Sequence, residues 1–129
     1  ADIREEMKQT MIFKVGIFRS KKPMEEALAK IRELKERYQR ITIQNKGKVY
    51  NVDLVRAQEL EGMLDVAEAI VTGALKREES RGAHSRLDFK ERDDVNFLKH
   101  TVATYSPSGP IITYSPVKIT KYKPEARRY

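Results

Sequence analysis

Apolar residues recur at helical spacing through three successive stretches of the first 80 residues, and this pattern constrains the fold most. The second stretch shows the spacing between Met24 and Tyr38, and the third carries two adjoining stripes between Ala57 and Ala74. Steps of three and four residues place side chains on one face of an α-helix. The first stretch carries the residues Ile3, Met7, Met11, Val15 and Phe18.

Local signals set the expected helix boundaries at about residues 3–20, 23–40 and 53–79. Pro23 suits the first turn of a helix, and Asp53 is a favourable N-terminal cap. A polar linker with a turn signal occupies residues 44–48. The wide apolar face of the third helix implies more than one packing neighbour. We expect residues 1–80 to form an antiparallel three-helix bundle.

The character of the chain changes after residue 80. Residues 101–105 and 111–114 are rich in β-branched and aromatic side chains, and a Ser/Pro/Gly turn cluster separates them. This pattern predicts a β-hairpin, which residues 117–122 can extend. Residues 86–96 have poor periodicity and room for only a short helical turn. The fold class is thus mainly α, with residues 81–129 forming an irregular charged segment and a C-terminal β-hairpin tail of the same domain.

The charged segment is too polar to be a core and too evenly balanced to be a basic tail. Seven basic and six acidic side chains lie between Lys76 and Lys99. Such a balance indicates an ion-pair network that a scaffold must hold in place. Arg81 and Arg86 offer planar guanidinium groups for carboxylates or carbonyls. Glu79, Asp93 and Asp94 are the nearby acceptors, and Gly82 is expected to end the third helix. The same segment also contains Ser80, His84 and Arg92.

Composition narrows the possible functions. There is no cysteine, so disulfides, thiolate metal sites and thiol nucleophiles are excluded. No apolar run approaches the roughly 20 residues that span a bilayer. The net charge of +7 raises the question of nucleic acid, but basic residues of the first half alternate with Glu, as on a solvated helix face. The tyrosines at 105, 114, 122 and 129 fit a stacking platform less well than a hairpin packed on a partner protein.

No constellation of catalytic or metal-binding residues stands out. The chain lacks a glycine-rich phosphate-binding motif. His84 and His100 lack the spacing of a helical metal pair. Ser80 and Ser85 beside His84 are more simply polar groups of a structured loop than a hydrolase triad. The carboxylates around Asp93 lie among Arg and Lys, which favours salt bridges over a cation site.

Four motifs together resemble a known family. They are residues 79–86 (ESRGAHSR), 91–101 (ERDDVNFLKHT), 114–120 (YSPVKIT) and the ending 124–129 (PEARRY). They are similar to the C-terminal part of the flavoprotein subunit of fumarate reductase and succinate dehydrogenase, and residues 4–11 resemble the start of that helical domain. The L-aspartate oxidases share a similar S-R-G-x-H element and remain an alternative. A free-standing basic helical module that binds nucleic acid is the alternative from another class.

The resemblance implies a fragment of an enzyme that interconverts succinate and fumarate. In that family, electrons pass through FAD and iron–sulfur clusters to or from quinone. The family's flavin and substrate residues precede this region, so the resemblance implies no catalytic, cofactor or metal residue here, and an isolated fragment that is inactive. It implies FAD in the full-length subunit, and as partners the N-terminal FAD-binding part and the iron–sulfur subunit. It implies only indirect contact with the membrane anchor, no nucleic acid, and a cytoplasmic position on the inner face of the cell membrane.

The resemblance also assigns structural and interface roles to a set of residues in the second part of the chain. Tyr114 lies in the expected hairpin, and His100 lies at its start. The full set is Glu79, Ser80, Arg81, Gly82, His84, Arg86, Arg92, Asp93, Asp94, His100 and Tyr114.

Overall fold

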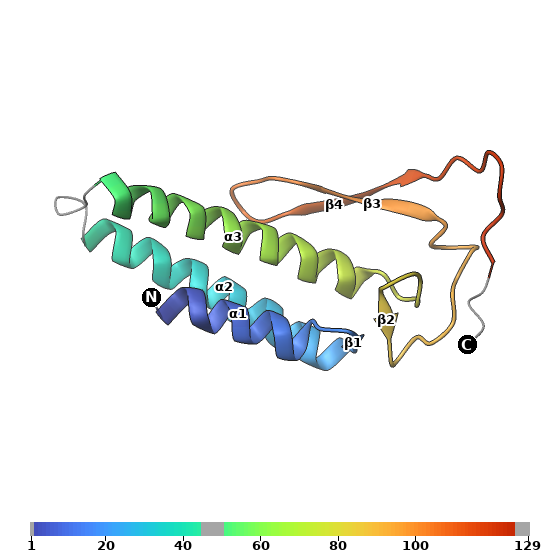
Figure 1. Ribbon diagram of the computed structural model, residues 1–129, viewed down its shortest axis with the longest axis horizontal. Coiled ribbons are helices and arrows are strands. Elements are labelled where there is room, and N and C mark those ends of the chain that lie inside the picture. The colour runs from blue at the N-terminus through green and yellow to red at the C-terminus, as the bar shows by residue number, and fades with distance from the viewer. Residues whose placement is uncertain (1, 45–50, 126–129) are drawn as a thin grey trace.

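Three helices make up most of the molecule. The computed structural model describes residues 2–44 and 51–125. The helices are α1 (Asp2–Lys14), α2 (Lys21–Gln44) and α3 (Asn51–Lys76). Successive helices run in opposite directions, and α2 packs against both α1 and α3 (Figure 1). The expected mainly α fold with an antiparallel three-helix bundle is confirmed.

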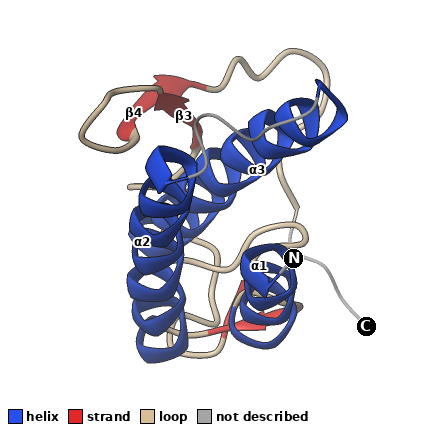
Figure 2. Ribbon diagram, turned by 90° about the vertical axis from the view of Figure 1, so that its left-hand side faces the viewer, coloured by secondary structure: helices blue, strands red, loops and turns tan. Residues whose placement is uncertain are grey.

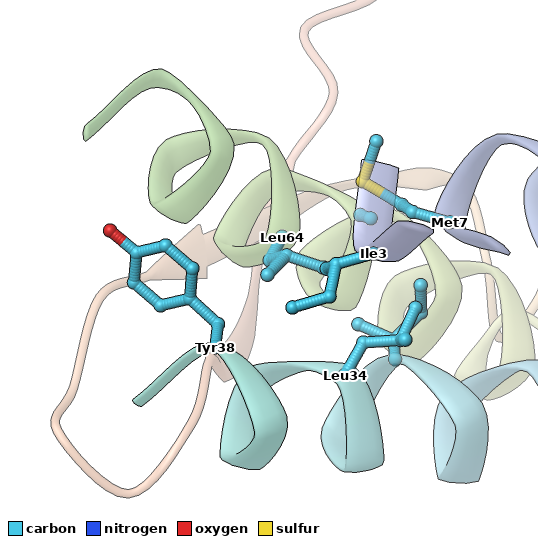
Figure 3. Packing of buried hydrophobic residues seen from close by; sticks show 7 residues of the cluster. Ile3, Met7, Leu34, Tyr38 and Leu64 are labelled. Carbon is cyan, nitrogen blue, oxygen red and sulfur yellow. The ribbon is translucent and has the colours of Figure 1, made fainter. Parts of the chain in front are cut away.

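The core of the bundle consists of two apolar clusters that follow one another along the helices. Buried positions on α2 alternate by three and four residues, so their side chains form one stripe that meets both neighbouring helices. In the first cluster, Leu34 and Tyr38 of α2 lie around Ile3 and Leu64 (Figure 3). The Tyr38 hydroxyl also donates a hydrogen bond to the Ala57 carbonyl oxygen at 2.7 Å. The second cluster comprises Val15, Met24, Ala27, Val71 and Ala74.

The first helix is shorter than its apolar stripe suggested. The prediction that it reaches residue 20 is wrong, because α1 ends at Lys14 and β1 (Phe18–Arg19) follows. Gly16 lies where the chain leaves the helix, and a Cβ there would stand 2.6 Å from the Ile12 carbonyl oxygen. Phe18, which the stripe placed in the core, is instead 70% exposed.

The other two helices also differ from their expected bounds. α2 continues past residue 40 to Gln44, and α3 begins at Asn51, two positions before the expected cap. The side chain of Asp53 and most of the expected linker, residues 45–48, lie outside the described residues. α3 ends at Lys76 rather than residue 79. Gly82 therefore does not terminate this helix.

A short parallel strand pair closes one end of the bundle. β1 pairs with β2 (Ser85–Arg86), so that Phe18 lies beside Ser85 and Arg19 beside Arg86. The Leu87 amide extends the pair by donating to the Arg19 carbonyl oxygen at 2.7 Å. The segment after α3 is thereby tied to the connection between α1 and α2.

The predicted β-hairpin is confirmed. β3 (Lys99–Thr104) pairs antiparallel with β4 (Ile111–Pro116). The turn between them uses Gly109 at a φ of 122°, a conformation that L side chains rarely adopt. Residues 117–122 do not extend the sheet, because β4 ends at Pro116. The expected short helical turn in residues 86–96 is a non-helical turn at residues 94–96.

The hairpin lies along α3, on the side away from α1 (Figure 2). It approaches the helix where α3 has no side chain, since a Cβ on Gly73 would meet Thr101 Cγ2 at 3.3 Å. Of the helices in the described part of the chain, none is both long and apolar enough to cross a membrane.

Candidate functional site

A buried carboxylate organises the segment that follows α3. The Glu79 side chain has no exposed surface. Its oxygens accept hydrogen bonds from Arg77 Nη1 at 2.6 Å, Arg81 Nε at 3.1 Å and the Asp93 amide at 2.9 Å. Burial alone would raise the pKa of Glu79, but the bonds from Arg81, Asp93 and Arg77 outweigh it and hold the pKa below its usual value. Glu79 is thus the ionised centre of the network.

Arg77 connects this centre to the hairpin. Its Nη1 donates to the Phe97 carbonyl oxygen at 2.8 Å. Its Nη2 donates to the Lys99 carbonyl oxygen at 2.5 Å and to Thr101 Oγ1 at 3.0 Å. The guanidinium also lies 5.6 Å from the centre of the Phe97 ring. One side chain therefore fixes the first strand of the hairpin to the end of α3.

Arg86 binds the C-terminal end of α3 from within the protein. The side chain is 1% exposed, and its Nη1 donates to the carbonyl oxygens of Ala74, Leu75 and Arg77 at 3.0–3.2 Å. These are carbonyls that a helix end leaves without partners, and the cation also complements the negative end of the helix dipole. Arg86 therefore acts as a cap supplied from the next segment of the chain.

Asp88 completes this arrangement and extends it to α2. Arg86 Nε and Nη2 each donate to one Asp88 oxygen at 2.8 Å, which is a two-point ion pair. The Lys21 amide, at the start of α2, also donates to Asp88 Oδ2 at 3.0 Å. The Arg86 pair lowers the pKa of Asp88 to about 2. Together the two side chains join the C-terminal end of α3 to the N-terminal end of α2.

His84 is held as a neutral ring. Arg19 Nη1 lies 3.0 Å from Nδ1, and the Arg77 carbonyl oxygen lies 3.0 Å from Nε2. Because a guanidinium only donates, Nδ1 must be the unprotonated nitrogen, and Nε2–H donates to the carbonyl. Burial lowers the pKa of His84, which agrees with this assignment. Both nitrogens are occupied, so the ring is a cross-link and not a base for Ser80 or Ser85.

Ser80 and Gly82 shape the backbone of the segment. Ser80 Oγ accepts from the Arg86 amide at 2.8 Å and donates to the Phe89 carbonyl oxygen at 2.7 Å. Arg81 and His84 exchange backbone hydrogen bonds across a two-residue turn. Gly82 has a φ of 59° at the first position of this turn. Positive φ at that position is the requirement that glycine meets in tight hairpin turns.

The two consecutive aspartates have different roles. Asp94 pairs with Arg81 at 2.6 Å and with Arg92 at 2.9 Å, as the balance of charges predicted. Asp93 forms no ion pair within the part of the chain that the structure covers. Its carboxylate accepts from the amides of Val95 and Asn96, so it stabilises a turn. Its backbone amide, rather than its charge, reaches Glu79.

His100 and Tyr114 lie outside this network. His100 is an exposed residue of β3, and it has no ion pair with any of the described residues. Tyr114 on β4 meets the edge of the Phe97 ring with 6.5 Å between centroids, and Lys99 Nζ lies 4.0 Å from the centre of its ring. Both residues belong to the hairpin, as expected, but the structure does not bring them to Glu79.

A family model supports the resemblance that the motifs suggested. The model described as the C-terminal part of the fumarate reductase flavoprotein matches residues 4–129. The chain belongs to this family. The network around Glu79 is therefore a feature of a fumarate reductase flavoprotein C-terminal domain.

Relatives and solved structures agree with this assignment. The chain is 52% identical to a fumarate reductase flavoprotein subunit of Haemophilus influenzae, over its whole length and 22% of the relative. It is 40% identical to a succinate dehydrogenase flavoprotein subunit of Rickettsia felis, over 93% of the chain and 20% of the relative. A quinol fumarate reductase structure from E. coli superposes on 97% of the chain and 22% of its own with a TM-score of 0.87 and 44% identity. The chain thus spans about a fifth of the length of these flavoprotein subunits.

Three residues important to this flavoprotein domain were not identified from the sequence. Arg77 binds the hairpin, Asp88 binds Arg86, and Arg19 binds His84. Arg77 lies two positions from Glu79, and Asp88 lies two positions from Arg86. Opposite charges at this separation could have indicated both ion pairs. Nothing in the sequence near Arg19 pointed to a partner 65 positions away.

Proposed function

We propose that this chain is the domain that braces the flavin-binding part of a flavoprotein subunit, and that the outward face of β1 and β2 is the surface that contacts it. The observation that carries this proposal is an apolar face backed by a rigid charged network. Phe18 and Leu87 are 70% and 53% exposed. Arg86, the residue between Ser85 and Leu87, points inward and is buried.

The alternation along these strands explains the arrangement. Successive side chains of a strand point to opposite faces, so Phe18 and Leu87 share the face opposite to Arg19 and Arg86. Ile17, directly before β1, is also exposed. Parallel strand pairs are usually covered on both faces, whereas this pair is covered on one. Exposed apolar groups beside a fixed framework are typical of an interaction surface.

The enzymatic role of the full subunit is part of the same proposal. Such a subunit would interconvert succinate and fumarate, with electrons passing through FAD and iron–sulfur clusters to or from quinone. FAD does not fit the described residues themselves, because their parallel strands are two residues long and lack a phosphate-binding turn. The chain would contribute support and no catalytic group. Its partners would be the FAD-binding part and the iron–sulfur subunit, at the cytoplasmic face of the membrane, with the membrane anchor contacted only indirectly.

Reconstitution with a relative tests this proposal. The Haemophilus influenzae subunit, prepared without its region that matches this chain, is mixed with the 129-residue chain. Binding is measured by calorimetry, and FAD retention and succinate oxidation are measured on the mixture. We expect association and recovery of FAD binding.

Paired substitutions locate the contact surface. Phe18→Asp with Leu87→Asp places two charges on the outward face and should weaken association about 100-fold, since desolvating unpaired charges is costly. Val95→Asp is the control, because Val95 is 92% exposed in a turn that belongs to neither β1 nor β2. Equal effects of the double variant and the control would contradict the assignment of this surface. Absence of any association with the unmodified chain would contradict the bracing function itself.

A further inference from the structure

A cleft lined by basic side chains lies between the end of α3, the start of β3 and the tail that follows β4. Its volume is about 710 Å³. Lys99, Lys118, Lys121 and Lys123 all line it, and no Asp or Glu is among the described residues of its lining. The bundle differs in this respect, since Lys14, Lys30, Lys35 and other cations there pair with carboxylates.

The lysine charges at the cleft are not neutralised by the rest of the described chain. Arg77 and Arg81 also line the cleft, but Glu79 and Asp94 balance them. Lys99 Nζ lies over the Phe97 and Tyr114 rings, and no ion pair with a described carboxylate is formed by Lys118, Lys121 or Lys123. Like charges around a concave surface focus a positive potential into it. The cleft therefore favours an anionic ligand.

The tail offers backbone groups as well as charges. Residues 117–123 run on from β4 without forming a strand, and between described residues their backbone groups make no hydrogen bonds. Leu98, Val117 and Ile119 add apolar surface to the lining. An extended peptide can use unpaired backbone groups, while its alternating side chains meet two different surfaces.

We propose that this cleft binds an extended acidic polypeptide segment, in which carboxylates alternate with apolar side chains. The carboxylates would contact Lys118, Lys121 and Lys123, and the apolar side chains would contact the surface around Ile119. A nucleic acid fits less well. Among the described lining residues, Tyr122 is the one Phe, Trp or Tyr, whereas single-stranded nucleic acids are held by several stacked rings.

A synthetic peptide tests the proposal on the 129-residue chain alone. The probe is a fluorescently labelled peptide of about ten residues in which Glu and Val alternate. Its affinity is measured by fluorescence anisotropy at about 0.1 M salt, where surface charges are screened over roughly 10 Å. The triple variant Lys118→Gln, Lys121→Gln, Lys123→Gln should bind the probe about tenfold more weakly, by analogy with exposed ion pairs.

A control variant that loses the same number of positive charges separates the effect of the cleft on binding from that of the overall positive charge of the chain. Lys8→Gln, Lys22→Gln and Lys90→Gln remove three exposed lysines that have no ion pair with described residues. This variant should change the affinity less than threefold, since its lysines do not line the cleft. Circular dichroism checks that both variants keep their helices, and Lys121→Gln alone serves as a milder variant.

Three results would overturn the proposal. The first is that the probe does not bind, and the second is that the control variant loses as much affinity for the probe as the triple variant. The third is that an oligonucleotide of equal charge binds more tightly than the probe and that the cleft substitutions weaken this binding. The inference goes beyond the bracing function and does not depend on it, because no flavin-binding part is present in this experiment. The two proposals can therefore fail separately.

Discussion

The helical bundle and the segment that follows it are stabilised by opposite means. All of the buried apolar side chains in the described residues lie between Ile3 and Ala74. After α3, the buried side chains are Glu79 and Arg86, which are among the most polar residues of the chain. The bundle is held by the removal of apolar surface from water, which tolerates small shifts. The following segment is held by directional hydrogen bonds to ionised groups, and such bonds tolerate few shifts in position.

The largest expected effect is the loss of the buried guanidinium. Arg86→Met removes the cap of α3 and leaves Asp88 without its partner. Breaking one side of a buried ion pair typically costs about 3–5 kcal/mol in the free energy of unfolding. Urea denaturation followed by circular dichroism measures this loss. Arg92→Met is the control, since Arg92 is more exposed and should lose less than about 1 kcal/mol. Similar losses of unfolding free energy in both variants would mean that burial of the ion pair does not contribute to stability.

The corresponding change in the bundle is Leu64→Ala. Leu64 is completely buried between the helices, so truncation leaves a cavity and should cost about 3 kcal/mol. The comparison with Arg86→Met is sharpened by pH. Lowering the pH towards 2 should narrow the deficit of Arg86→Met and leave that of Leu64→Ala nearly unchanged, because only the ion pair with Asp88 loses a charge. Ile70→Ala, at a half-exposed position of α3, is the control and should cost less than Leu64→Ala. A pH response of equal size in both variants would contradict the distinction.

A smaller effect is expected from the pH dependence of Asp88. The pKa of Asp88 is lowered to about 2 in the folded protein from an ordinary 3.8. The charged carboxylate therefore contributes stability that is fully present above about pH 4 and is lost as the pH falls through about 2. Asp88→Asn should be less stable than the unmodified chain by about 1–2 kcal/mol at pH 5, after discounting for partial exposure. Thermal denaturation should show this difference shrinking towards pH 2, and a constant difference would refute the assignment.

The smallest effects compare one glycine from each region. A Cβ on either Gly62 or Gly82 would meet nothing within 4 Å, so neither substitution by Ala creates a clash. Gly62 lies inside α3, where Ala should stabilise the chain by about 0.5–1 kcal/mol. Gly82 has a φ of 59°, so Ala there should destabilise it by about 1–2 kcal/mol. Melting temperatures of the two variants should move in opposite directions, and a shift of the same sign would show that backbone conformation is not the cause.

The bundle and the hairpin were predictable because their signals are local. Steps of three and four residues between Met24 and Tyr38 define a helix face without knowledge of its partner. β-Branched residues on both sides of a turn define the hairpin in the same way. The same reasoning failed at Phe18, since an apolar residue in register with a helical stripe can still lie beyond the end of the helix. Periodicity reports a face but does not report where the helix ends.

The charged network was only partly predictable because its bonds depend on tertiary placement. Arg81 and Arg86 were expected to meet carboxylates or carbonyls, and Arg81 does pair with Glu79 and Asp94. Arg86 bonds to carbonyls of α3 and to Asp88, and the prediction named neither that helix end nor Asp88. Asp93 has the same charge as Asp94, yet its carboxylate is used by local backbone amides. The sequence shows which donors and acceptors are present, but the tertiary structure determines which of them form hydrogen bonds with each other.

The parallel pairing of β1 with β2 also bears on the order in which the molecule forms. The contact between Arg19 and His84 joins positions 65 residues apart. Closing so long a loop carries an entropy cost that local helix formation does not, and distant contacts generally form late. Residues 2–76, which form the three helices, are also synthesised before His84. We therefore expect the strand pair to form after the bundle, so that Phe18 and Leu87 are fixed on one face only once the helices have packed.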